Sequence, residues 1–121
     1  MTFLELDDAI AIIDELAVGP VRDIGLLDSA IHRPQAAAFG ELAYPTIHLQ
    51  AAVLLESLSR NHPLVDGNKR LSWTAVVVFY GLNGVRLRAP HDAAYDLVIA
   101  VCTSERDYHE TAAALEQWCD Y

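Results

Sequence analysis

The sequence predicts an all-α fold, a bundle of about six helices in one compact domain that spans residues 1–121. Apolar residues recur three and four positions apart in several segments, and helix-capping residues stand ahead of most of these segments. Alternating patterns typical of strands are nearly absent. With 121 residues, 53% of them apolar, the chain can form one sizeable core, and a second independent domain is not expected.

The first two helices are predicted from their start and stop signals. Thr2 and Glu5 have the spacing of a capping box, and Gly19-Pro20 ends the helix that follows them. A second helix is expected to begin near residues 23–25, where apolar residues again recur at helical spacing.

The third helix is expected between a loop and a proline. The stretch "FGELAYPT" is interpreted as the loop, and Thr46 at its end as the N-cap. Pro63 disfavours helical backbone at His62, so the helix should stop near Asn61. Its apolar positions predict one buried face: Ile47, Ala51, Leu54 and Leu58.

The fourth helix is expected to be a buried central helix. The stretch "KRLSWTAVVVFYGLNG" is apolar nearly all round, and although its β-branched run is compatible with a strand, its length favours a helix. Asn83-Gly84 is a natural stop, and "VRLRAP" after it is predicted to be a short connector or extended piece.

Two further helices complete the predicted bundle. One is expected from about Asp92 to Thr103, and the other after Asp107, with Glu110 in the position of a capping-box partner. His91-Asp92 could suggest an HD-type metal-dependent phosphohydrolase, but no partner ligands are evident in the sequence. Asp92 is therefore interpreted as a helix N-cap.

Composition argues against several classes of function. The net charge is −9 and no long run of Lys or Arg interrupts the acidic background, so direct nucleic-acid binding is not expected, and any phosphate site must be locally basic. The N-terminus is acidic where a secretory signal would be positive, and the apolar runs are too short to span a bilayer. These features predict a soluble, cytoplasmic protein.

The cysteines and most histidines suggest no metal or disulfide chemistry. Cys102 and Cys119 form no CxxC pattern and are too few for a disulfide framework, so buried reduced thiols are expected. His48 and His109 are interpreted as surface or capping residues, because no pair of histidines has a convincing zinc spacing. Trp118 could cover the edge of the core or contact a partner.

The stretch "RNHPLVDGNKRLSW" (residues 60–73) carries a dense set of reactive side chains. Its loop leads into the N-terminus of the predicted central helix, where unpaired N–H groups and the helix dipole attract anions. Gly67 lets the backbone turn or approach a ligand closely, and Asn68 can cap the helix or donate a hydrogen bond through its side-chain amide. Lys69 and Arg70 stand where cations oppose the dipole, which suggests that an anion binds there.

Two residues of the same loop add catalytic chemistry. Asp66 offers a hard oxygen ligand, suited to a Mg²⁺ that arrives with nucleotide phosphates. His62 can accept a proton from a hydroxyl near neutral pH. Base, metal ligand and phosphate cradle together predict transfer of a phosphorus group from a nucleotide. A polar connection between two helices is the alternative.

The stretch "HPLVDGNKR" resembles the core motif of the Fic/Doc family, usually His-Pro-Phe-x-Asp/Glu-Gly/Ala-Asn-Gly/Lys-Arg. Leu64 stands where the family usually has Phe, and is expected to anchor the loop in the core less tightly. The surrounding stretches "RDIGLLDSAIHRPQ", "AYPT" and "FYGLNG" resemble the Doc branch, whose members are toxins of toxin–antitoxin pairs.

The resemblance implies a role for each motif position. His62 would be the general base for a target hydroxyl, and Asp66 would hold Mg²⁺ or orient the phosphates. The residues implied to bind the nucleotide phosphates are Arg60, Gly67, Asn68, Lys69 and Arg70. Tyr44-Pro45 would belong to a flap that docks the target backbone, with a simple proline-closed turn as the alternative.

Two positions divide the family by reaction. Members that transfer AMP usually have Gly where this chain has Lys69, and a second Arg where it has Trp73. The resemblance therefore implies a Doc-like kinase, in which ATP binds the other way round and its γ-phosphate lies beside His62. The implied substrate is a threonine of translation elongation factor Tu, whose phosphorylation stops protein synthesis. The alternatives are AMP or other nucleotide transfer, and a catalytically silent binding module.

The resemblance also implies a partner. Many Fic proteins carry an inhibitory helix in which a glutamate is followed by Gly or Asn, and no glutamate in this chain has that neighbour. A separate antitoxin of the Phd (prevent-host-death) type would then restrain the protein, with its C-terminal segment folded onto the bundle.

Overall fold

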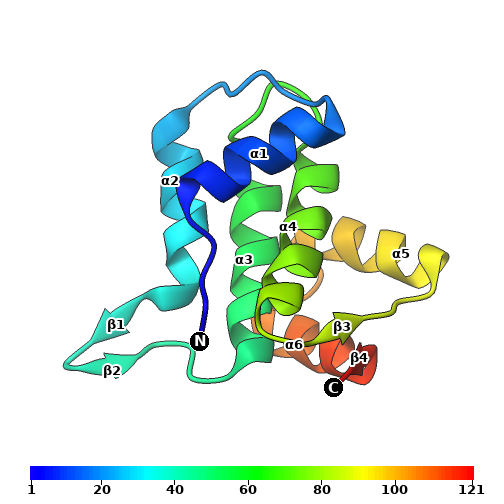
Figure 1. Cartoon of the computed structure of the whole chain (residues 1–121). Coiled ribbons are helices and arrows are strands. Elements are labelled where there is room, and N and C mark those ends of the chain that lie inside the picture. The colour runs from blue at the N-terminus through cyan, green and yellow to red at the C-terminus, as the bar shows by residue number, and fades with distance from the viewer.

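Six α-helices form a bundle in the computed structural model, which describes residues 1–121 (Figure 1). They are α1 (Leu6–Leu16), α2 (Ile24–His32), α3 (Ile47–Asn61), α4 (Asn68–Leu82), α5 (His91–Cys102) and α6 (Tyr108–Gln117). A short 3-10 helix, η1 (Arg33–Gln35), continues α2. The predicted all-α bundle of about six helices is confirmed. No helix is both long and apolar enough to cross a membrane.

Two small antiparallel ribbons accompany the helices. They pair β1 (Ala37–Ala38) with β2 (Glu41–Leu42), and β3 (Arg86–Leu87) with β4 (Cys119–Asp120). The first ribbon is a hairpin that projects from the bundle (Figure 1), where the sequence predicted only a loop. Its turn residues Phe39 and Gly40 both have positive φ, 55° and 79°, as a two-residue hairpin turn requires. Phe is rare in that conformation, which hid the turn from the sequence analysis.

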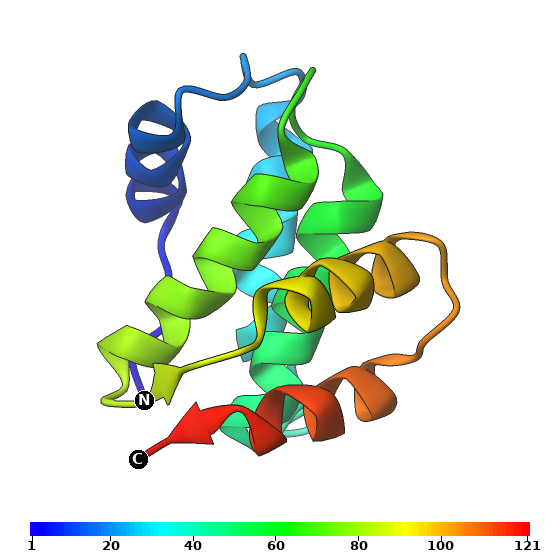
Figure 2. The same ribbon diagram turned by 90° about the vertical axis from the view of Figure 1, so that its right-hand side faces the viewer.

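Helix α3 lies at the centre of the fold. It packs against α2, η1, α4, α5 and α6, and every residue from Gln50 to Ser59 is buried. Figures 1 and 2 show α3 beside α4, with α1 and α2 on one side of the pair and α5 and α6 on the other. The sequence predicted burial of one face of α3, and this was wrong because neighbours surround the helix.

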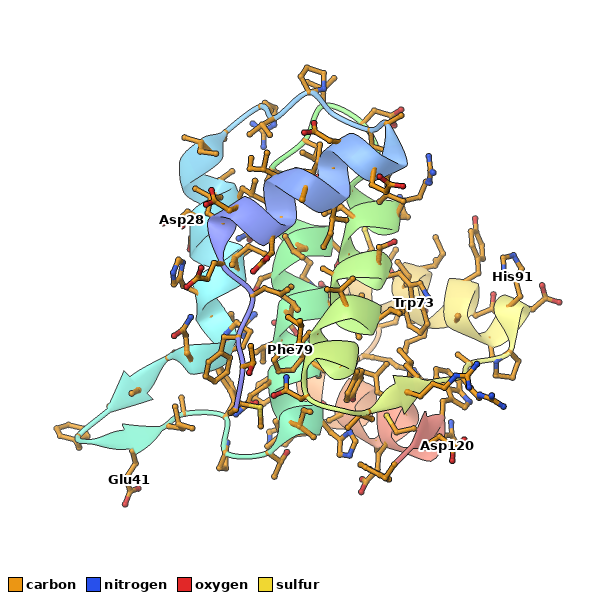
Figure 3. All side chains as sticks on the ribbon, in the orientation of Figure 1. Asp28, Glu41, Trp73, Phe79, His91 and Asp120 are labelled. Atoms are coloured by element: carbon orange, nitrogen blue, oxygen red, sulfur yellow. The ribbon has the colours of Figure 1, made fainter.

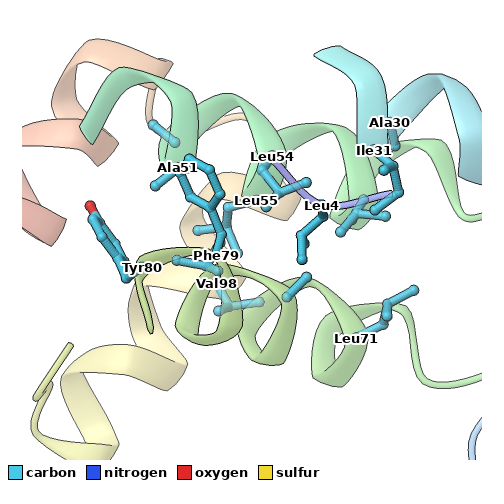
Figure 4. Close-up of a cluster of buried hydrophobic side chains, with 14 of the residues drawn as sticks. Leu4, Ala30, Ile31, Ala51, Leu54, Leu55, Leu71, Phe79, Tyr80 and Val98 are labelled. Atoms are coloured by element: carbon cyan, nitrogen blue, oxygen red, sulfur yellow. The ribbon is translucent and has the colours of Figure 1, made fainter. Parts of the chain in front are cut away.

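Helix α4 supplies the other half of the core, as its apolar sequence predicted. Its buried side chains include Leu71, Phe79 and Tyr80, none of which has exposed surface. Figure 4 shows Phe79 of α4 next to Leu55 of α3, with Leu71 farther along α4 in the same core. Helix α4 is nevertheless less enclosed than α3, because one side of α4 reaches solvent.

The helix caps confirm three of the predicted starts. The Asp23 carboxylate accepts a hydrogen bond from the Leu26 N–H at 3.1 Å, and the Thr46 hydroxyl accepts one from the Leu49 N–H at 3.2 Å. At α6 the N-terminal residue pair Asp107 and Glu110 forms the predicted capping box. These caps fix where α2, α3 and α6 begin.

Two predicted caps were wrong. Helix α1 begins after Glu5, whose N–H donates to the Asp8 carboxylate at 2.8 Å, so the box lies three residues later than expected. Thr2 instead exchanges two backbone hydrogen bonds of 2.8 Å with the side-chain amide of Asn83, which fastens the N-terminus to the end of α4. Helix α5 already begins at His91, so Asp92 lies inside its first turn and is no N-cap.

His48 is not the surface or capping residue that was predicted. It is half-buried, with Nδ1 2.8 Å from the Tyr80 hydroxyl and Nε2 2.5 Å from the Tyr121 hydroxyl. Burial, with the nearby Cys119, raises the pKa of Tyr80 above its usual range, so this phenol keeps its proton. His109, in contrast, is exposed at the start of α6, as predicted.

Both cysteines are free thiols, as the sequence indicated, but they are half-buried rather than buried. Each donates a hydrogen bond to a backbone carbonyl, Cys102 to that of Ser59 at 3.7 Å and Cys119 to that of Leu115 at 3.3 Å. They therefore take part in ordinary packing at the edge of the core.

A carboxylate inside α3 is neutralised by two arginines from opposite directions. The Glu56 side chain is 12% exposed, and its two oxygens lie 2.9 Å from Arg33 Nη1 and 3.3 Å from Arg60 Nη1. Arg33 also donates to the Ser57 hydroxyl at 2.9 Å. This network joins η1 to the centre of the bundle.

Replacing Glu56 should test how far the fold depends on this network. Glu56→Ala leaves two half-buried arginines without their counter-charge, so we expect the free energy of unfolding to fall by about 2–3 kcal/mol, less than for a fully buried pair. Urea unfolding measures it, with Glu15→Ala as the control because Glu15 is exposed on α1. Equal losses for the two variants would contradict a stabilising role for the network.

Candidate active-site loop

The motif loop joins the end of α3 to the start of α4. His62 follows the last helical residue and has left-handed backbone, with φ 51° and ψ 56°, and its side chain is exposed. Pro63 and Leu64 then turn inward, and Leu64 is only 2% exposed within the main core. Leucine therefore anchors the loop at the position where the family usually has phenylalanine.

Asn68 closes the loop on itself. Its Oδ1 accepts a hydrogen bond from the Leu64 N–H at 2.9 Å, and its Nδ2 donates to the Leu64 carbonyl at 3.0 Å. The side chain that was predicted to bind phosphate thus holds the shape of the loop in this structure. Its backbone N–H remains available at the helix start.

The first turn of α4 presents unpaired donors. The Leu71 N–H bonds to the Gly67 carbonyl at 2.9 Å, and the N–H groups of Asn68, Lys69 and Arg70 precede this bond and have no partner. No acidic residue lies in this turn. Three N–H groups at the positive end of a 15-residue helix are suited to bind an anion.

Two exposed cations flank these donors. Lys69 makes no ion pair, and Arg70 makes only a 3.5 Å contact from Nη2 to the Leu16 carbonyl. The carboxylate of Asp66 is also exposed and unpaired, while its carbonyl accepts from the Gly19 N–H at 3.0 Å. The loop therefore brings His62, Asp66 and these cations onto one exposed end of the bundle.

Asp66 is the one carboxylate of the loop and does not form a metal site by itself. No three His, Cys, Asp or Glu side chains gather closely enough to hold a metal ion. Its free oxygens fit a Mg²⁺ that brings further oxygen ligands with it, such as those of nucleotide phosphates.

The chain between α1 and α2 runs along the motif loop, and the sequence analysis missed it. We call residues 18–23 the strap. It pairs with the loop through an isolated antiparallel bridge, Val21 to Leu64, and through further backbone bonds. These join Gly19 N to Asp66 O (3.0 Å), Val65 N to Pro20 O (3.0 Å), Arg22 N to Pro63 O (2.7 Å) and Asp23 N to Pro63 O (3.2 Å). Figure 1 shows the two segments side by side at the top of the bundle.

Close packing of the strap against the loop requires a glycine at position 67. It has φ +93°, and a Cβ at this position would lie 2.4 Å from the Cβ of Val18. The sequence predicted that Gly67 lets the backbone turn or approach a ligand closely, and the close neighbour that the structure shows is Val18 of the strap. The motif residues alone could not have predicted this contact, because Val18 lies far from Gly67 in the sequence.

Arg60 is directed elsewhere. Its Nε donates to the Val101 carbonyl at 2.8 Å and its Nη2 to the Arg106 carbonyl at 3.1 Å, while Nη1 pairs with Glu56. None of these contacts is with the motif loop. The structure does not bring this guanidinium together with the other predicted phosphate ligands.

A groove begins beside the two cations and runs between α4 and α5. Its volume is about 260 Å³. It combines aromatic, apolar and basic side chains, among them Lys69, Arg70, Trp73, His91, Tyr95 and Val98. Figure 3 shows Trp73 on the side of α4 that faces α5. The sequence singled out Trp73, but helix packing was needed to bring α5 beside it.

Tyr44 lies far from this loop, which corrects the flap interpretation. It precedes the N-terminus of α3, whereas His62 follows the C-terminus, and 15 helical residues separate these ends by about 22 Å. Tyr44 packs against Tyr108 and the Arg33 guanidinium instead. Figure 1 shows the β1–β2 hairpin at the same distant end.

Comparison with known proteins agrees with this geometry. The sequence model of the Fic/DOC family matches residues 3–80, which include the strap, the loop and most of α4. The chain belongs to the Fic/Doc family. It is 52% identical over 97 residues to Toxin Doc of Mycolicibacterium smegmatis, an alignment that covers 78% of this chain and 75% of that protein. Within Fic/Doc, this chain belongs to the Doc branch. Members of Fic/Doc are generally enzymes that transfer a nucleotide or a phosphate to proteins.

Substituting Gly67 should show whether the strap and the loop are tightly packed. Gly67→Ala combines a positive φ with a clash against Val18, so we expect unfolding free energy to fall by about 2–4 kcal/mol. Gly84→Ala is the matched control, because Gly84 has φ +75° and open space around its Cβ position, and it should cost about 1 kcal/mol. Thermal and urea unfolding compare the two, and similar losses would argue against close packing.

Proposed function

We propose that this chain is the toxin of a toxin–antitoxin pair and a protein kinase. It transfers the γ-phosphate of ATP, with Mg²⁺, to a threonine hydroxyl of translation elongation factor Tu and so inhibits translation. The observation that carries the proposal is one exposed loop that presents His62 beside the unpaired N-terminal turn of α4. The 52% identity to a protein named Toxin Doc supports the toxin role.

The proposed chemistry assigns the proton to His62. As the threonine oxygen bonds to the γ-phosphorus, the bond from that phosphorus to its bridging oxygen breaks and ADP leaves. The exposed imidazole of His62 accepts the hydroxyl proton. A bound Mg²⁺ would neutralise phosphate charge, and Asp66 is the residue that would hold it.

The phosphates would bind at the first turn of α4. The free N–H groups of Asn68, Lys69 and Arg70 are supplemented there by two exposed cationic side chains. These cations stand at the helix end where they weaken an isolated helix, and a bound anion would reverse that effect. A net charge of −9 makes such a local basic site necessary.

Lys69 and Trp73 favour phosphate transfer over nucleotide transfer. The Fic/Doc pattern for AMP transfer has Gly and Arg at these two positions. Trp73 instead lines the groove between α4 and α5 together with Tyr95 and His91. Aromatic and apolar walls next to a basic mouth suit a nucleoside whose phosphates point towards α4.

We propose that the restraining partner is an antitoxin of the Phd type. No glutamate among these 121 residues is followed by Gly or Asn, which is the pattern of the inhibitory segment that some Fic/Doc proteins carry. Transcription of an adjacent short reading frame together with this one would support a paired antitoxin.

Intact mass measurement tests the reaction. With ATP, Mg²⁺ and elongation factor Tu, we expect a phosphate-sized gain on the factor, and His62→Ala should slow it by about 10²–10⁴-fold because the base is lost. His109→Ala is the control, since His109 is exposed on α6. An adenylate-sized gain would replace the kinase by nucleotide transfer, and no gain would favour a silent binding module.

A double substitution tests the assignment of Lys69 and Trp73. In Lys69→Gly with Trp73→Arg, a cation is moved to the position it occupies in AMP-transferring relatives, so phosphate transfer should fall by about tenfold or more. An adenylate-sized product should appear on the same target. If the double variant transfers phosphate as fast as the unchanged chain, these positions do not select the reaction.

A further inference from the structure

The C-terminus of α3 cannot be capped in the way α1 is. At the end of α1, Ala17 has left-handed backbone, and the N–H groups of Ala17 and Val18 turn back to the Asp14 and Ile13 carbonyls at 3.2 and 3.3 Å. His62 has the same left-handed conformation at the end of α3. The next residue is a proline, which has no N–H to give, so the terminal carbonyls of α3 need another donor.

Arg22 of the strap supplies that donor. Its Nη2 donates to the His62 carbonyl at 2.6 Å and to the Asn61 carbonyl at 3.4 Å, and its Nε donates to the His62 carbonyl at 3.0 Å. A guanidinium also suits the negative end of the α3 dipole. We propose that Arg22 is a positioning residue, which fixes the backbone that carries the His62 imidazole. The proposal rests on the proposed role of His62 as the base.

The conformation of His62 makes such a contact necessary. A left-handed backbone costs about 1 kcal/mol or more for a residue other than glycine, and a following proline restricts it further. Such a conformation persists only where the surroundings determine it. Arg22 binds two successive carbonyls, because its guanidinium donates to that of His62 and its backbone N–H donates to that of Pro63 at 2.7 Å. The strap and the side chain together therefore hold the backbone on both sides of Pro63 in one orientation.

Arg22 contributes little to the core. Its side chain is exposed, and its hydrogen bonds are exposed as well. Removing the guanidinium should therefore free the His62–Pro63 peptide while α3 and α4 stay folded. A general stabilising residue would instead affect all helices alike.

The test compares Arg22→Ala and Arg22→Lys with Arg88→Ala, in which an exposed guanidinium without hydrogen bonds is removed. NMR of the full chain follows the His62 Cα shift, which reports its backbone conformation, and the exchange of the Val65 amide, which bonds to the Pro20 carbonyl of the strap. Steady-state phosphate transfer to elongation factor Tu gives kcat, and the KM for ATP.

In Arg22→Ala the Cα shift of His62 should leave its left-handed value, and the Val65 amide should exchange about 10- to 100-fold faster. Transfer should lose about tenfold or more in kcat with little change in KM, because the phosphate-binding turn of α4 is untouched. Lysine should restore part of the loss, since it has charge but no fork of donors. Guanidinium ion at a concentration that leaves the protein folded should restore kcat in Arg22→Ala and not change Arg88→Ala.

Three results would overturn the proposal. In the first, Arg22→Ala leaves both the His62 Cα shift and the exchange rate of the Val65 amide unchanged. In the second, amide exchange becomes equally faster throughout α3 and α4. In the third, the His62 shift and the Val65 exchange change but kcat does not. If the unchanged chain transfers no phosphate, the proposed function fails, while the shift and exchange measurements still decide what Arg22 does to the loop.

Discussion

The enclosure of α3 is the constraint on which the rest of the structure depends. A helix buried on every side from Gln50 to Ser59 can reach solvent only at its two ends. One end carries Thr46 and the hairpin, and the other carries His62 and the motif loop. Because the helices around α3 fix its position, they also fix the point at which the exposed histidine leaves the core. The loop itself can then be short, since the helix before it is held rigidly.

The polar residues inside α3 determine how its neighbours attach. Glu56 would be costly in the core without its two arginines, and each arginine brings another element with it. Arg33 comes from η1, and Arg60 reaches across to carbonyls at the end of α5 and in the turn before α6. On the other side, Arg22 binds the last carbonyls of α3 from the strap. The end of α3 is thus held by two guanidinium groups, that of Arg22 from the strap and that of Arg60 within α3 itself.

Most of the fold could be predicted from local signals, and two of the failures share one physical cause. Caps such as Asp23, Thr46 and Asp107 were predictable because cap and recipient lie within three residues. The cap at Thr2 failed because a distant side chain, Asn83, took its backbone groups. The strap was missed for the same reason, since its partners in the loop lie 40 or more residues away in the sequence. Arg22 stood in a stretch that resembled the Doc branch, but no local pattern assigned it a contact.

The candidate site shows a similar division between motif and geometry. The motif correctly marks a loop at a helix start, with an exposed histidine and an exposed carboxylate. It does not distinguish side chains that build the loop from side chains that are free to bind. The Asn68 side chain is hydrogen-bonded to the backbone of Leu64, and Gly67 is needed because Val18 packs against it. Only the folded structure shows which hydrogen-bond donors remain free to bind a ligand.

The cations, too, divide into those that hold the structure together and those that are free to bind a ligand. This division reduces the number of residues that can form the phosphate site. Arg22, Arg33 and Arg60 all lie near α3, yet each guanidinium is occupied by carbonyls or by the Glu56 carboxylate. A cation that already neutralises a carboxylate or caps a helix has little left to offer a phosphate. Lys69 has no partner, and Arg70 has only one contact of 3.5 Å, so these two retain their donors. In a chain with 17 acidic and 8 basic residues, the position of uncommitted charge is more informative than the number of cations. That position is the first turn of α4, beside the exposed imidazole of His62.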